Sequence, residues 1–95
     1  MTERIANIKC AVEKNLGGMA RHVTSTVVIE VFEESLMWEG VVETFEVLCV
    51  PNVTRCYGFT YREDDSIGFA TVAETDAVDS PKMAVRAFFA SKIQP

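Results

Sequence analysis

The chain has 95 residues, of which 48% are hydrophobic, and its formal net charge is −5 from 14 acidic and 9 basic side chains. This length predicts a single domain over residues 1–95, and the hydrophobic content is too high for a disordered chain. The acidic balance argues against binding to nucleic acid or to an anionic membrane, because both partners are negatively charged. The basic residues are also scattered, without a run that would form a basic patch.

The predicted compartment is the cytoplasm. No apolar stretch approaches the roughly 18 residues of a membrane span, and the first residues, MTERIANIKC, do not have the pattern of a secretory signal. Cys10, Cys49 and Cys56 lack the spacing of zinc ligands. We therefore expect reduced thiols, no metal site and no cofactor.

The first predicted element is a helix over residues 2–16. Thr2 is a suitable capping residue, and Gly17 tolerates the left-handed conformation that ends many helices. Between them, apolar residues recur at spacings of three and four and form one stripe. These residues are Ile5, Ile8, Val12 and Leu16.

A strand is predicted next, over residues 23–32, because this stretch is rich in β-branched residues. Side chains alternate between the two faces of a strand. One face carries Val27, Ile29 and Val31, and the other carries Val28, Glu30 and Phe32. Because both faces are mainly apolar, we expect this strand to be central in its sheet or covered on both sides.

Three more strands are predicted over residues 38–49, 53–62 and 67–74, followed by a helix that begins at Pro81. The order is therefore α-β-β-β-β-α. Each helix must bury one apolar stripe, and a sheet offers the surface for this. We expect an α+β fold, a two-layer sandwich in which both helices pack on one face of a four-stranded antiparallel sheet and leave the other face uncovered.

The stretch RCYGFTY over residues 55–61 resembles the aromatic third strand of RNA-recognition-motif domains. Arg55, Tyr57, Gly58 and Phe59 match that pattern, whereas a cysteine and an arginine stand where a glycine and the last aromatic are expected. That family runs β-α-β-β-α-β, unlike this chain. The order helix, strands, helix is similar to double-stranded-RNA-binding domains, but their lysine cluster at the start of the last helix is missing. RNA binding is therefore not predicted.

The aromatic residues of this strand have three interpretations. Tyr57, Phe59 and Tyr61 share one face with Arg55, and they are suited to packing under a helix, to a subunit interface or to the wall of a ligand pocket. Trp38, the single tryptophan, is suited to a core position or to anchoring an interface or a pocket.

Glu30 and Glu43 lie among apolar residues on their predicted strands, which makes them candidates for acid–base chemistry. A structural role is favoured, because opposed like charges destabilise a sheet. Each glutamate is expected to face a basic group or the solvent, and Arg55 on the adjacent strand is a candidate partner of Glu43. His22, predicted to precede the first strand, has no sequence neighbour that indicates a catalytic triad.

The sequence therefore predicts a small binding or interaction protein that forms a homodimer, with no assignable reaction. The alternative is a small-molecule-binding protein with an aromatic pocket between helices and sheet. The candidate ligand-binding or interface residues are Trp38, Glu43, Arg55, Tyr57, Phe59 and Tyr61.

Overall fold

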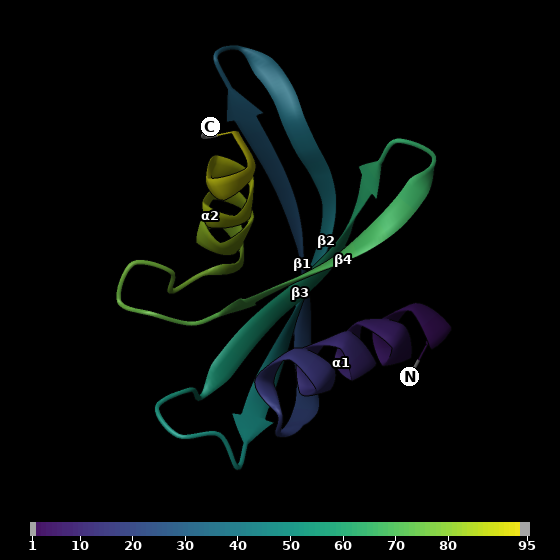
Figure 1. The fold of residues 1–95 in the computed structure, drawn as a ribbon. Helices are drawn as coiled ribbons and strands as arrows, with labels where there is room; N and C mark the ends of the chain where they lie inside the picture. The colour runs from purple at the N-terminus through teal and green to yellow at the C-terminus, as the bar shows by residue number, and fades with distance from the viewer. Residues whose placement is uncertain (1, 94–95) are drawn as a thin grey trace.

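The fold consists of one antiparallel sheet and two helices (Figure 1). The computed structural model describes residues 2–93, without the side chains of Phe32 and Ile93. The elements follow the order α1 (Glu3–Leu16), β1 (Met19–Phe32), β2 (Ser35–Leu48), β3 (Arg55–Glu63), β4 (Ser66–Ala73) and α2 (Pro81–Ile93). The predicted α+β class, the element order and the four-stranded antiparallel sheet are confirmed.

The strands form a meander in the order β1-β2-β3-β4. β1 is therefore an edge strand, and the expectation that it is central or covered on both sides was wrong. It also begins at Met19, earlier than predicted, and pairs with β2 along nearly its whole length. Consecutive antiparallel strands joined by short turns lie side by side, which leaves the first strand with one neighbour.

The two helices lie on opposite faces of the sheet, not on one face as predicted (Figure 1). Alternation along β3 separates their contacts. Cys56 and Gly58 point towards α1, and Tyr57 and Phe59 point towards α2. Each end of the sheet is therefore covered by one helix on one face only. α1 covers one face at one end, and α2 covers the opposite face at the other end.

Each helix begins with a side-chain cap. The Thr2 hydroxyl accepts a hydrogen bond from the Ile5 amide at 3.2 Å, and the Ser80 hydroxyl accepts one from the Met83 amide at 3.3 Å. Such caps satisfy amides that have no partner within the helix. α1 ends at Gly17, whose φ of 75° is the left-handed conformation that the sequence predicted.

The hydrophobic core is divided into two clusters, one under each helix. The cluster under α1 contains the buried residues Ile8, Val12, Ala20, Phe45, Val47 and Cys56. The cluster under α2 contains Val28, Val42, Tyr57, Phe59, Ala70, Val78, Ala84 and Val85. Neither helix covers the whole sheet, so each cluster serves only one end of it.

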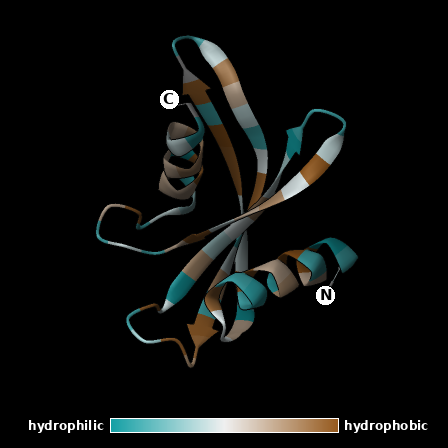
Figure 2. Cartoon of the chain, in the orientation of Figure 1, coloured by the Kyte–Doolittle hydropathy of each residue, from teal (hydrophilic) through white to brown (hydrophobic). Residues whose placement is uncertain are grey.

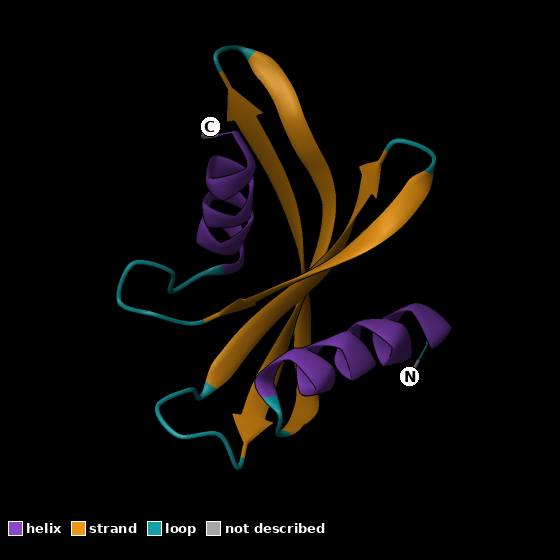
Figure 3. Ribbon diagram, viewed as in Figure 1, coloured by secondary structure: helices purple, strands orange, loops and turns teal. Residues whose placement is uncertain are grey.

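The two hairpins are joined by a short ladder. β2 and β3 pair only from Glu43 to Glu46 and from Arg55 to Gly58. Beyond this segment the β1–β2 hairpin and the β3–β4 hairpin diverge (Figure 3). The sheet therefore opens into two arms on one side of its centre.

Gly58 of β3 lies directly beneath α1. A Cβ at this position would stand 2.4 Å from Ile8 Cγ2, well inside van der Waals contact. We expect Gly58→Ala to lower the free energy of unfolding by about 1–3 kcal/mol, the usual cost of overpacking a core. Urea denaturation followed by circular dichroism measures this change.

The matched control is Asn7→Ala, which alters the exposed side of α1 and leaves its packed side intact. This control should keep or slightly raise the stability, because alanine favours helix. An unchanged urea midpoint for Gly58→Ala would contradict the close approach of α1 to β3.

Candidate functional site

The aromatic residues of β3 lie mainly in the core. Tyr57 is 1% exposed and Phe59 is 0% exposed, and both pack in the cluster under α2. Tyr61 is half-buried, with its ring centroid 4.9 Å from that of Phe88 on α2. Of the three interpretations, packing under a helix describes the positions of Tyr57 and Phe59.

Tyr57 has one polar contact at the margin of this core. Its hydroxyl donates a hydrogen bond to Glu74 Oε2 at 3.2 Å. Burial, and then the Glu74 carboxylate, raise the pKa of the Tyr57 hydroxyl above its ordinary value. Tyr57 therefore stays a neutral hydrogen-bond donor at physiological pH.

Arg55 is not the partner of Glu43, contrary to prediction. It lies at the exposed start of β3, directly opposite Glu46, whereas Glu43 is opposite Gly58. Arg55 and Glu43 therefore lie at opposite ends of the short ladder. The ladder register, which the sequence alone does not fix, decides this outcome.

Glu43 instead lies at the centre of a polar cluster between α1 and the sheet. Its side chain is 1% exposed. Arg4 on α1 donates to Glu43 Oε2, and the Ser25 hydroxyl donates to Oε1. His22 Nε2 also lies 2.8 Å from Oε1. Arg4 in addition donates to the Val41 carbonyl oxygen at 2.8 Å, which fixes α1 against β2.

A β-bulge brings His22 and Ser25 together. Residues three apart in a regular strand point to opposite faces. The register of β1 shifts between His22 and Thr24, and this extra residue places both side chains on the face of Glu43. Sequence reasoning missed Arg4 and Ser25, and placed His22 before the strand, because a bulge leaves no clear signal in the composition.

The cluster does not have the geometry of a Ser-His-Glu triad. In a triad the serine and the carboxylate contact different ring nitrogens of the histidine. Here Ser25 Oγ and Glu43 Oε1 both approach Nε2, and Ser25 Oγ is 3.4 Å from it. Burial by itself would raise the pKa of Glu43, but the hydrogen bonds from Ser25, Arg4 and His22 outweigh it and lower that pKa. A weakly basic carboxylate is suited to anchoring α1 rather than to taking protons.

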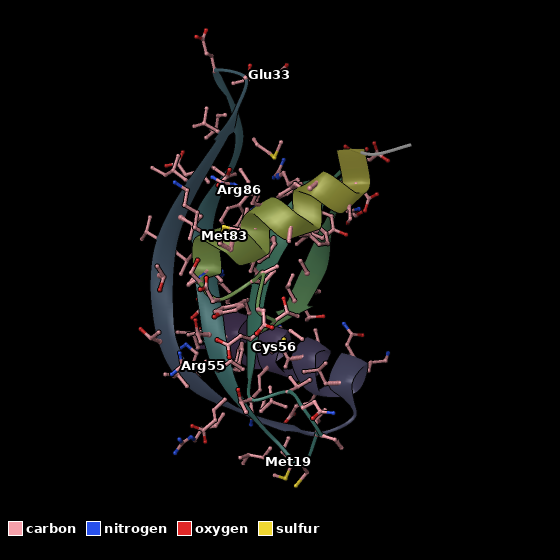
Figure 4. The ribbon with its side chains drawn as sticks, turned by 90° about the vertical axis from the view of Figure 1, so that its left-hand side faces the viewer. Met19, Glu33, Arg55, Cys56, Met83 and Arg86 are labelled. Atoms are coloured by element: carbon pink, nitrogen blue, oxygen red, sulfur yellow. The ribbon has the colours of Figure 1, made fainter. Side chains whose placement is uncertain are left out.

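Glu30 forms a second buried carboxylate site on the opposite face. Arg86 Nε on α2 donates to Glu30 Oε1 at 3.0 Å, while Glu30 Oε2 is buried without a hydrogen-bond partner among the described residues. Figure 4 shows Arg86 on the part of α2 that lies beside the β1–β2 hairpin. Glu30 and Glu43 therefore do not form a catalytic pair, because they point to opposite faces of the sheet.

The three cysteines are free thiols in different surroundings. Burial raises the pKa of the Cys56 thiol to about 11, so this thiol is protonated and inert at neutral pH. Cys10 and Cys49 are free and exposed. Among residues 2–93, no group of three His, Cys, Asp or Glu side chains is arranged to hold a metal ion.

β1 carries a row of exposed apolar side chains. Val27 is 72% exposed, Ile29 52% and Val31 53%, on the face that α1 leaves uncovered. Leu36, opposite Val31 on β2, is also exposed. Figure 2 shows hydrophobic residues on the part of the β1–β2 hairpin near its turn. Figure 4 shows β1 along the outer margin of the molecule.

Trp38 lies where the two hairpins diverge. Its indole Nε1 donates to the Thr60 carbonyl oxygen at 3.1 Å, and its ring packs against Phe59 with centroids 5.0 Å apart. The half-buried ring forms part of the wall of an open cleft. Trp38 and Tyr61 are therefore the predicted aromatic residues that border a cleft.

Comparisons with family models, with characterised proteins and with solved structures found no match to this chain. Among the described residues, no helix has the length and apolar content needed to cross a membrane.

The lowered pKa of Glu43 predicts a pH-dependent contribution to stability. A carboxyl group whose pKa is lower in the folded state stabilises the fold above its unfolded pKa, and this contribution is lost as the pH falls through the folded value. We expect Glu43→Gln to reduce the unfolding free energy by about 1–3 kcal/mol near pH 7, with the difference from wild type shrinking below about pH 4. Urea titrations from pH 3 to pH 8 measure it.

Glu46→Gln is the matched control, since Glu46 is also on β2 and also pairs with an arginine, Arg21, at 3.0 Å. That pair is largely exposed, so its loss should cost less than about 1 kcal/mol. Equal effects of the two substitutions, or a difference for Glu43→Gln that does not shrink in acid, would contradict the assigned role of Glu43.

Proposed function

We propose that the protein acts as a homodimeric interaction module, in which β1 of one copy pairs with β1 of a second copy. The observation that carries this proposal is the exposed apolar edge of β1. Edge strands usually carry lysine, proline or a bulge, because unpaired backbone groups otherwise recruit another strand. From Thr24 to Glu30 this edge has no lysine, proline or glycine, and no bulge.

The regular part of β1 is suited to pairing with itself. Its ladder with β2 runs without a register shift from Thr24 to Glu30. The first shift adds a residue to β1, between His22 and Thr24, and the second adds one to β2, between Leu36 and Trp38. Val27 is the central residue of that stretch. An antiparallel pairing about a two-fold axis at Val27 therefore uses all of it, and the same patch meets itself, as symmetric dimers require.

The side chains are compatible with this pairing. Val27 would lie opposite Val27 of the second copy, and Ser25 opposite Ile29. Thr24 would lie opposite Glu30, so like charges do not face each other along the stretch. Glu30 itself points inward to Arg86. The result would be a continuous eight-stranded sheet, with the exposed valine and isoleucine rows of the two copies side by side.

This proposal predicts that Val27→Lys dissociates the dimer without unfolding the chain. Val27 is exposed in the single chain, so a lysine there costs the monomer little. In the dimer it places two like charges directly opposite each other. We expect the dissociation constant to rise at least about tenfold, equivalent to about 1.4 kcal/mol, in sedimentation equilibrium.

Ile67→Lys is the matched control, because Ile67 is similarly exposed but lies on β4, at the other edge of the sheet. This variant should sediment as wild type. A wild-type chain that remains monomeric at high micromolar concentration would overturn the proposal, and so would dissociation by Ile67→Lys alone.

A cysteine at position 27 tests the register. In a background with Cys10→Ser and Cys49→Ser, Val27→Cys should form a disulfide-linked dimer on oxidation. Directly opposite residues in antiparallel strands have Cβ atoms about 4.5–5.5 Å apart, close to disulfide geometry. Non-reducing gel electrophoresis with copper phenanthroline as oxidant measures the yield.

Ile29→Cys in the same background is the control. Its exposure is comparable, but two copies of residue 29 would be four residues apart along the paired strands, about 13 Å. It should therefore cross-link poorly. Equal yields from the two variants would show random collision and contradict pairing about Val27.

A further inference from the structure

A cleft of about 450 Å³ opens where β2 and β3 stop pairing. This volume lies within the roughly 300–1,000 Å³ of small-molecule sites. Three aromatic side chains, Trp38, Tyr61 and Phe89, line it together with Glu39 and Arg62. The cleft lies between the hairpins, on the far side of β2 from the outer edge of β1, so it is separate from the proposed dimer contact.

Two glycines place the aromatic walls of this cleft. A Cβ at Gly40 would stand 2.7 Å from Trp38 Cζ2, and a Cβ at Gly68 would stand 2.5 Å from Tyr61 Cζ. Each ring therefore lies close against a glycine, on its own strand for Trp38 and on the paired strand for Tyr61. The Trp38 indole is held further by its hydrogen bond to Thr60. The ring surfaces are thus fixed before any ligand arrives, which reduces the entropy lost on binding.

The charged residues of the cleft lie on opposite sides of it. Glu39 comes from β2, and Arg62 comes from β3. Within residues 2–93, neither side chain forms an ion pair or a side-chain hydrogen bond, with the other or with any other residue. One carboxylate and one guanidinium are therefore both available beside the aromatic surface.

We propose that this cleft binds a small aromatic zwitterion, with the chemistry of a free aromatic α-amino acid. Its ring would lie against the parts of Trp38 and Tyr61 that border the cleft, since Phe59 packs on Trp38 and Lys92 Nζ lies 4.8 Å from the Tyr61 ring centroid. Its carboxylate would meet Arg62, and its ammonium group would meet Glu39. Each group of the ligand then contacts a group of opposite charge or an aromatic face, and both unpaired charges of the cleft gain a partner.

Trp38 is the single tryptophan of the chain, so its fluorescence reports on the cleft alone. L-phenylalanine, which is not excited at 295 nm, is the probe. We expect a saturable change in Trp38 emission with L-phenylalanine. Phenylacetate lacks the ammonium group and phenethylamine lacks the carboxylate, so each should bind about tenfold more weakly, the effect of losing one charge-assisted hydrogen bond.

Charge-neutral variants assign the two contacts. Arg62→Gln should weaken L-phenylalanine binding about tenfold and leave phenethylamine binding unchanged, because phenethylamine has no carboxylate. Glu39→Gln should weaken L-phenylalanine binding similarly and leave phenylacetate binding unchanged. Arg55→Gln is the matched control on β3. Arg55 does not line the cleft, so this variant should bind all three probes as wild type does.

Two results would overturn the proposal. One is the absence of a saturable response to L-phenylalanine in a folded wild-type chain. The other is binding of phenylacetate or phenethylamine as tight as that of L-phenylalanine, because the opposed charges would then contribute nothing. Neither result bears on dimer formation, which sedimentation measures independently.

Discussion

The short ladder between β2 and β3 is the constraint on which the rest of this structure depends. Only the segments Glu43–Glu46 and Arg55–Gly58 pair, and they join two hairpins whose own strands pair over much greater lengths. Phe45 and Cys56 point to one face of this ladder, and Tyr57 points to the other. Both core clusters therefore meet at the same few residues, and a helix closes each face. A ladder this short needs packing on both sides, because a small sheet gains its stability from burial.

Each helix is tied to the sheet by an arginine that reaches a buried glutamate. Arg4 of α1 contacts Glu43, and Arg86 of α2 contacts Glu30. The two glutamates occupy equivalent places in the repeated pattern Val-x-Glu-x-Phe, at residues 28–32 and 41–45. Buried ion pairs contribute little net stability, and their clearest value is in fixing one arrangement. The repeated glutamates therefore place one such contact on each face of the sheet, one for each helix.

The elements were predictable from the sequence because their signals are local. The cap at Thr2, the left-handed Gly17 and the proline at position 81 lie where the sequence placed them, and β1 shows the predicted alternation of Val27 and Val28. The predictions that were wrong concern how the elements are placed relative to one another. A bulge at Val23, the ladder register and the choice of face for each helix all depend on tertiary packing, which residue type does not encode.

The same reasoning explains the aromatic residues. The alternation of side chains along the strand placed Tyr57, Phe59 and Tyr61 on one face, correctly, but their exposure depends on where α2 lies. Tyr57 and Phe59 lie beneath α2, and Tyr61 lies near its end, beside the cleft. Trp38 was a candidate because of its residue type. Gly40 and Gly68 could not be recognised as part of a cleft from the sequence, because their contacts with the rings of Trp38 and Tyr61 depend on the folded structure.

The position of β1 links the fold to its proposed function. A meander with its first strand at the edge leaves that strand's outer backbone groups unpaired within residues 2–93. α2 buries Val28 and contacts Glu30, while α1 lies at the other end of the sheet, so Val27 and Ile29 are left exposed. Isolated exposed apolar residues are ordinary, but a continuous row along an unprotected edge is not. A second strand at this edge would pair the outer backbone groups of β1, which is the basis of the proposed dimer.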